Sequence, residues 1–109
     1  MKGILLTLSR LPYAGMTIFP FIFLRKKDLP ATASLLNHER IHLRQQLELL
    51  ILPFYIWYLT AYLYHRLKGK NHEVAYRSIV FEKEAYKYEN DPDYLSNRKF
   101  WAFLSETVN

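Results

Sequence analysis

Two histidines four residues apart flank a glutamate in the segment His38-Glu39-Arg40-Ile41-His42. Residues i and i+4 lie on one face of an α-helix, so both imidazoles can bind one metal ion. Zn²⁺ accepts such nitrogen ligands, and a glutamate beside the first histidine can act as general base toward a zinc-activated water. This spacing makes His38 and His42 candidate zinc ligands and Glu39 the candidate catalytic base.

The residues around this motif predict a helix over residues 31–51, with Asp28 or Thr32 as its N-cap. At about 100° per residue, the motif borders an apolar stripe of the helix, and charged residues fall on the far side. The stripe consists of Leu36, Leu43, Leu47 and Leu50. Gln45 and Gln46 are expected to be ordinary hydrogen-bonding residues beside a sheltered metal site.

A zinc ion held by two histidines needs a third protein ligand. The residues that could supply it are His65, His72, Glu73, Glu82, Glu84 and Glu89. In a predicted helix of residues 72–90, Glu82 lies in the middle of the apolar face, whereas Glu84 falls opposite, beside Arg77, as a solvated carboxylate. A buried carboxylate needs compensation, so Glu82 is the predicted third ligand. A buried salt bridge from Glu82 to Arg10 or Arg44 is the alternative.

The chain must turn sharply for Glu82 to reach the two histidines. If residues 31–67 formed one straight helix, Glu82 would stop about 24 Å short of them at ~1.5 Å per residue. Proline breaks a helix interior, so Pro53 is expected to separate the motif helix from an aromatic-rich helix of residues 53–67.

The segment His38-Glu39-Arg40-Ile41-His42, followed by Glu82-Lys83-Glu84-Ala85, resembles the HExxH and ExxA motifs of gluzincin metallopeptidases. The likeness is to minimal single-domain and CAAX-protease-type forms. It implies a minimal zincin-like core, a peptide or protein substrate, His38, His42 and Glu82 as zinc ligands, and Glu39 as general base.

The family's second motif often continues with an aspartate that supports a zinc histidine, and this chain has Tyr86 at that position. Tyr86 lies one turn beyond Glu82 on the same predicted face. It is therefore a candidate catalytic residue that would stabilise the oxyanion, and Tyr13 or another loop tyrosine is the alternative.

The rest of the chain predicts one α+β domain, mostly helical, over residues 1–109. Residues 1–27 are expected to contain two short strands, at 3–9 and 15–26, as a β-hairpin or edge strand packed on three to four helices. Pro20 makes the second an edge or bulged strand, and an exposed edge there could pair with an extended peptide. A short terminal helix is predicted at residues 94–105.

Composition narrows the partners and the compartment. The chain has no cysteine, so disulfides and thiolate zinc sites are excluded. The net charge of +5 comes without a dense basic face, which favours mild attraction to anionic membranes over nucleic-acid binding. The apolar residues 49–64 are short for a membrane span, so a buried or interfacial helix is expected. No secretion signal is evident, which predicts a cytoplasmic protein in peripheral contact with the inner membrane face.

Two functions follow as hypotheses. The first is a zinc-dependent metallopeptidase. The second is a non-catalytic zinc-binding or membrane-associated scaffold, in which zinc would lock the helices of a small core together. The two differ at the fourth coordination position of the metal, which is open to a groove in a catalytic site and closed by protein in a structural one.

Overall fold

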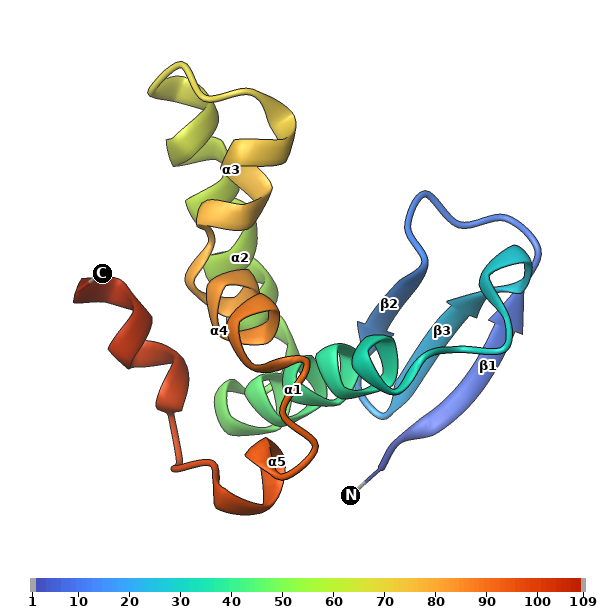
Figure 1. Cartoon of the computed structure of the whole chain (residues 1–109). Helices are drawn as coiled ribbons and strands as arrows, with labels where there is room; N and C mark the ends of the chain where they lie inside the picture. Colours follow the sequence, from blue (N-terminus) through green and yellow to red (C-terminus); the bar gives the residue numbers. More distant parts are fainter. Residues whose placement is uncertain (1, 109) are drawn as a thin grey trace.

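The computed structural model describes residues 2–108, with a small sheet at one end of a group of helices (Figure 1). This architecture confirms the predicted α+β, mostly helical fold class. The elements in chain order are β1 (Ile4–Leu8), β2 (Gly15–Ile18), β3 (Phe21–Arg25), the 3₁₀ turn η1 (Lys26–Asp28), α1 (Ala33–Leu49), α2 (Ile51–Leu67), α3 (His72–Ser78), α4 (Val80–Tyr88), α5 (Tyr94–Asn97) and the 3₁₀ segment η2 (Ala102–Val108).

The sheet has the strand order β1-β3-β2, with β3 parallel to β1 and antiparallel to β2. The prediction of one edge or bulged strand over residues 15–26 is therefore wrong. The chain reverses at Phe19 and Pro20, so this stretch forms a hairpin whose second strand is the centre of the sheet. Proline has no N–H to donate, and at this turn Pro20 contributes its carbonyl instead, which accepts from the Ile4 N–H at 2.8 Å.

A sharp corner joins α1 to α2, and the two helices are bent by 113°. Thr32 caps α1 by accepting from the Leu35 N–H, and the helix ends at Leu49 before Leu50, whose φ is 65°. Pro53 is the third residue of α2, where its missing N–H costs no helical bond. The predicted break is present, but it lies at Leu50 rather than at the proline.

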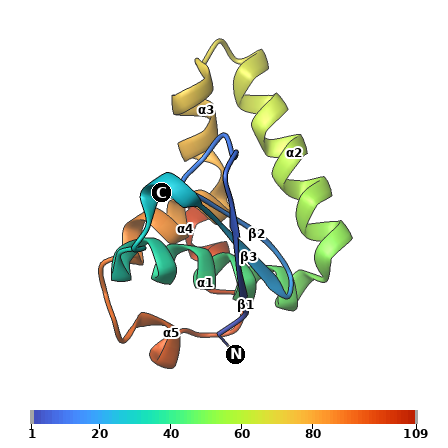
Figure 2. The same cartoon turned by 90° about the vertical axis from the view of Figure 1, so that its right-hand side faces the viewer.

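The predicted helix of residues 72–90 is two helices, α3 and α4, separated at the extended residue Ile79. The Ser78 hydroxyl donates to the Val74 carbonyl at 2.7 Å, a local bond that bends helices. The break turns Ile79 inward, and it becomes fully buried in one core cluster with Phe54, Phe81 and Phe103. Figure 2 shows α3 running beside α2.

The predicted terminal helix of residues 94–105 is also interrupted. Only Tyr94–Asn97 is α-helical, and η2 begins at Ala102. Between them Trp101 has φ 61°, which turns the chain back toward α4 (Figure 1). This return buries Arg98 and Phe103 against α4, so α4 is covered on the side that the sequence pattern left to solvent.

A second core cluster holds α1 against the sheet through Ile22, Leu24 and Leu43. The middle of α1 and the first half of α4 carry the buried residues of these two helices, and the two helices pack against each other. Among residues 2–108, no single helix is long and apolar enough to cross a membrane, and α1 with α2 meets that test only as a bent pair.

Candidate metal centre

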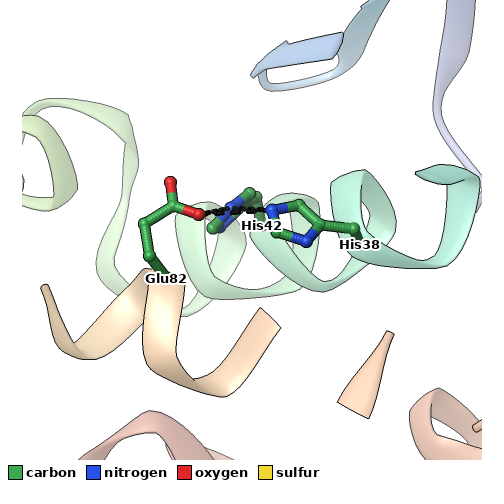
Figure 3. Close-up of side chains that lie close together, drawn as sticks. All are labelled: His38, His42 and Glu82. Carbon is green, nitrogen blue, oxygen red and sulfur yellow. Dashed lines mark hydrogen bonds and ion pairs between the residues drawn. The ribbon is translucent and has the colours of Figure 1, made fainter. Parts of the chain in front are cut away.

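His38 and His42 on α1 and Glu82 on α4 point their ligand atoms toward one another in the interior (Figure 3). The Nε2 atoms of the two histidines lie 3.2 Å apart. Glu82 Oε1 lies 3.2 Å from Nε2 of His38 and 3.1 Å from Nε2 of His42. All three residues are buried. The predicted ligands thus come together from two helices, and this group could hold a metal ion.

The outer nitrogen of each ring contacts a hydrogen-bond acceptor. His38 Nδ1 lies 3.0 Å from Glu89 Oε1, and His42 Nδ1 lies 2.8 Å from Gln45 Oε1. Each Nδ1 therefore carries the proton that it donates, and a neutral ring then presents an unprotonated Nε2 to the centre. Three lone-pair-bearing atoms converge in this state, which is the arrangement that a metal cation stabilises.

The amide of Gln45 is held in the orientation that this tautomer needs. Its Nε2 donates to the Phe81 carbonyl at 3.1 Å and to Glu84 Oε1 at 2.8 Å. A flipped amide would place its oxygen against two acceptors, so Oε1 must face His42. Gln45 is therefore more than the ordinary hydrogen-bonding residue expected from the sequence, because it fixes the tautomer of one histidine.

Glu89 takes the position of partner to His38. Its second carboxylate oxygen accepts from the Ser34 hydroxyl at 2.9 Å, which fixes the carboxylate beside the ring. From the sequence, Glu89 was only one of several possible third ligands, and its role as the hydrogen-bond partner of His38 was not predicted. The spacing of the two glutamates could have indicated it. Glu89 lies seven residues, or about two helical turns, beyond Glu82, which places both on the same side of the helix.

Without a metal ion, the centre favours a proton. Burial alone would lower the pKa of His42, but the Glu82 carboxylate outweighs burial and raises it to about 9. Burial would raise the pKa of Glu82, and His42 and His38 instead hold it well below its usual range. The Tyr58 hydroxyl donates to Glu82 Oε2 at 2.7 Å, which leaves Oε1 to face the two rings.

Glu39 lies beside β2, next to the centre. The Thr17 hydroxyl donates to Glu39 Oε1 at 2.8 Å, and Glu39 is 5% exposed. A Cβ at Gly15 would come within 3.1 Å of Glu39 Oε2, so the absence of a side chain at Gly15 makes room for this carboxylate. The sequence pattern did not indicate a role for Gly15 or Thr17.

A cavity of about 380 Å³ borders both Glu39 and the metal centre. Its walls are mainly aromatic and come from the loop before β2, from β2, and from α1, α2, α3 and α4. The lining residues are Tyr13, Gly15, Met16, Thr17, Glu39, His42, Gln46, Phe54, Tyr55, Tyr58, Leu59, Tyr62, His72, Tyr76 and Glu82. A side of the centre is therefore open to a space of the size that small ligands occupy.

Tyr86 lies on another side of the centre. Its ring packs edge-on against His38, with centroids 4.5 Å apart, and Arg77 covers it at 4.0 Å. Tyr86 lines a smaller hollow together with Tyr13, His38 and Glu39, whereas Tyr13 lines both this hollow and the larger cavity. Both tyrosines thus line the smaller hollow with the predicted base, and Tyr13 also lines the larger cavity.

Glu84 is not solvated, so the sequence expectation for it is wrong. It is fully buried, and its carboxylate accepts from Arg98 Nη2 at 3.0 Å and from the Tyr94 hydroxyl. Arg98 Nη1 also donates to Glu48 Oε2 at 2.6 Å. The face of α4 that carries Glu84 is opposite Glu82 as predicted, but the returning C-terminal segment covers it.

The remaining candidate ligands have other partners. His65 lies 2.7 Å from Lys70 Nζ, and His72 contacts Tyr13 and Tyr62 hydroxyls through its two ring nitrogens. Glu73 accepts from Arg77 at 2.8 Å on the surface. Arg44, one of two proposed ion-pair partners for Glu82, donates to the Leu95 carbonyl instead. The other, Arg10, lines a surface hollow with Arg25 and Lys27.

The free edge of β2 runs along the cavity. Its register on β3 leaves the backbone groups of Gly15 and Thr17 pointing away from the sheet. Gln46 donates to the Thr17 carbonyl at 2.8 Å and accepts from the Phe19 N–H at 2.7 Å, and the Tyr55 hydroxyl also donates to the Thr17 carbonyl. Side chains of α1 and α2 therefore occupy the backbone groups of this edge from the Thr17 carbonyl onward, and the Thr17 N–H and the groups of Gly15 stay open.

Comparison with known proteins adds no family to this geometry. The resemblance of the two motifs to gluzincins therefore depends on the residues and on their arrangement around the metal centre. Neither the known protein-family models, nor the curated protein sequences, nor the solved structures gave a match to this chain.

Proposed function

We propose that this protein is a gluzincin-like zinc metallopeptidase, in which His38, His42 and Glu82 hold Zn²⁺ and Glu39 is the general base. One observation carries the proposal. Three ligand atoms from two helices form a buried triangle with sides of 3.1 to 3.2 Å, next to a carboxylate in a cavity. Ligands at ~2.0–2.1 Å from tetrahedral zinc are spaced by roughly 3.3 Å, so the triangle fits one face of a zinc tetrahedron.

The donor set also favours zinc chemically. Two imidazoles and one carboxylate, with one side open to a cavity, are a common ligand set of catalytic zinc, whereas structural sites use four protein ligands. No fourth histidine or acid joins the group among the described residues. This supports a catalytic centre over the alternative of a zinc ion that only locks the helices together.

The chain's own residues account for the proton transfers of peptide hydrolysis. Zn²⁺, when bound, supplies Lewis-acid activation of a water at neutral pH. Glu39 accepts the proton of the attacking water and returns it to the leaving amine. The Thr17 hydroxyl holds Glu39 Oε1, and Tyr58 holds Glu82 Oε2, so both carboxylates keep fixed orientations. Tyr13 and Tyr86 are the proposed donors to the oxyanion.

The substrate is proposed to be an extended peptide on the free edge of β2. The outward-pointing groups of Gly15 and the Thr17 N–H offer backbone hydrogen bonds beside Glu39. The aromatic cavity next to this edge favours an apolar side chain of the peptide.

The test combines metal analysis with one substitution. Purified protein should contain one zinc per chain, and Glu39→Gln should retain the metal while lowering cleavage of an unstructured peptide by at least ~10²-fold. Glu73→Gln is the matched control, because Glu73 is a surface carboxylate paired with Arg77. It should leave the zinc content and the rate of peptide cleavage unchanged. Protein without zinc contradicts both metal hypotheses. Zinc without cleavage in the unaltered protein leaves the structural alternative, and cleavage that survives Glu39→Gln overturns the mechanism.

The two tyrosines can be separated by the same assay. Loss of one oxyanion donor lowers kcat by about 10² to 10³ with little change in KM. Tyr86→Phe and Tyr13→Phe should therefore differ, and the variant with the larger loss of kcat identifies the donor. Equal activity of both variants with the unaltered protein would remove this role from the two residues.

A further inference from the structure

One face of the sheet carries apolar side chains and is turned away from the core cluster between the sheet and α1. Ile22 and Leu24 are buried against α1, so strand alternation turns Phe21 and Phe23 to the opposite face. The register then places Ile4 and Ile18 beside Phe21, and Leu6 and Met16 beside Phe23. We call this surface the outer face, and it consists of Ile4, Leu6, Leu8, Met16, Ile18, Phe21 and Phe23.

Five residues of the outer face are exposed, and Met16 and Phe23 are half-buried. Ile4 is 49% exposed, Ile18 43%, Leu8 41%, Leu6 40% and Phe21 36%. A sheet that packs one face on a core normally presents polar side chains on its other face. A continuous apolar surface of this kind marks an interaction site. In Figure 1 the helices lie to one side of the strands, so the sheet is at one extreme of the molecule.

The charge of the protein is concentrated in the same segment. Residues 1–28 contain five Lys and Arg and one acidic residue, Asp28, which is a net charge of +4 out of the total of +5. Residues 29–109 contain ten Lys and Arg and nine acidic residues. Lys2 lies at one end of the strands, and Arg10, Lys26 and Lys27 lie exposed at the other.

We propose that the outer face is a docking surface for an anionic lipid bilayer, with the sheet lying flat in the interfacial region. The apolar rows would enter the boundary between headgroups and acyl chains, and the lysines and arginines at the strand ends would contact anionic headgroups. Headgroups and water can bond the unpaired backbone edge of β1, which the hydrocarbon core could not do.

Charge favours a bilayer over a second copy of the chain. A two-fold dimer through the outer face would bring two segments of charge +4 together and leave the basic residues facing one another. An anionic surface removes that repulsion, and each basic residue near it increases partitioning about five-fold. This inference goes beyond the proposed function and does not depend on the metal centre.

Docking would also set the position of the cavity. Met16 belongs to the outer face and lines the cavity at the same time, and Leu59, which is 58% exposed on α2, lines it from the other side. A bilayer against the outer face therefore lies next to the cavity. Ligands that enter it would come from the membrane surface.

The experiment measures co-sedimentation of the full chain with phosphatidylcholine vesicles that contain or lack phosphatidylserine. Binding is expected only with phosphatidylserine and should weaken at high salt. Leu6→Thr combined with Phe21→Thr should lower partitioning at least ~10-fold by removing apolar contacts. Lys26→Gln combined with Lys27→Gln should lower it roughly 25-fold, at about five-fold per charge.

Matched variants elsewhere control for general loss of hydrophobicity or charge. Phe100→Thr changes a residue that is 74% exposed in the C-terminal segment, and Lys68→Gln with Lys99→Gln removes the same charge from outside the sheet. Both should bind within about two-fold of the unaltered protein. The surface charge variants keep the fold, so the test stands even if the threonine variant unfolds.

Three outcomes overturn the proposal. The first is no sedimentation with phosphatidylserine vesicles. The second is an equal loss of binding in the Lys26/Lys27 and Lys68/Lys99 variants, which would indicate non-specific charge attraction. The third is a dimer in light scattering that Leu6→Thr with Phe21→Thr converts to monomer, which would assign the outer face to a second copy.

Discussion

Two buried carboxylates lie on opposite faces of α4, and their surroundings differ in one respect. Glu84 meets the guanidinium of Arg98 as well as donors from Tyr94 and Gln45, so its charge is compensated within the fold. Glu82 instead contacts the ring nitrogens of His38 and His42 (Figure 3) and accepts from the Tyr58 hydroxyl. The cluster of Glu84 has its cation within the fold, whereas the cluster of Glu82 could hold a metal ion and, without one, favours a proton on His42.

The largest expected effect comes from neutralising each glutamate in turn. Glu82→Gln removes one of three ligands, so zinc affinity should fall by several orders of magnitude, roughly 10³-fold or more, with the metal-free fold retained. Glu84→Gln should leave zinc bound but destabilise the protein, because Arg98 loses a buried partner. Competition with a chelator measures the first effect, and urea unfolding of metal-free protein measures the second. If Glu82→Gln and Glu84→Gln changed zinc affinity equally and stability equally, the two glutamates would not have the different roles described above.

The second effect is on stability alone. Arg98→Met removes the cation between two carboxylates whose side chains are 0% and 2% exposed, so the free energy of unfolding should fall by about 3 to 5 kcal/mol. Adding Glu84→Gln and Glu48→Gln should recover much of this loss, since no buried charge then remains. Lys99→Gln, a neighbouring surface change, is the control. Chemical denaturation of metal-free protein measures all three.

The third effect concerns Gln45, which connects the two clusters. Gln45→Met keeps the volume but leaves the His42 Nδ1–H without its acceptor, so zinc affinity should fall about 10- to 100-fold. Gln45→Glu restores an acceptor for His42 but places its second oxygen against the Phe81 carbonyl and Glu84, so it should recover zinc affinity in part while lowering the free energy of unfolding. Chelator competition compares the three proteins. An unchanged affinity in Gln45→Met would show that the amide has no influence on the metal centre.

The fourth effect, about ten-fold for each pH unit, is the pH dependence of metal binding. In the metal-free protein His42 keeps its proton up to a pH of about 9, and zinc must displace that proton. Zinc affinity should therefore rise about ten-fold per pH unit below 9 and level off above it. Calorimetry in buffers of different ionisation enthalpy should detect one released proton near neutral pH. Affinity that is independent of pH would mean that His42 is neutral before zinc binds.

Much of the metal centre could be predicted from the sequence because it depends on local periodicity. The spacing of His38 and His42 on one helix face and the apolar setting of Glu82 are properties of single helices, and the structure brings these residues together. The need for a corner between α1 and α2 followed from chain length. The position of the corner could not be predicted, because it forms at Leu50 with a positive φ, which leucine rarely adopts.

The features that sequence reasoning missed depend on contacts between distant segments. Glu84 falls on the predicted face of α4, but its burial requires the C-terminal segment to turn at Trp101 and bring Arg98 over it. Spacing within α4 contains no information about that return. The apolar residues of β1 and β3 likewise suggest buried strands, and only the arrangement of α1 on one side of the sheet reveals the outer face.

Gln46 restricts what the free edge of β2 can bind. Its amide occupies the Thr17 carbonyl and the Phe19 N–H, so it takes the place that a residue of an added strand would fill. Only the two backbone groups of Gly15 and the N–H of Thr17 remain for a guest chain. Such a guest can therefore extend freely in one direction only. For the proposed peptidase, this means that a scissile bond close to one terminus of a peptide should be preferred over one in the middle of a long chain.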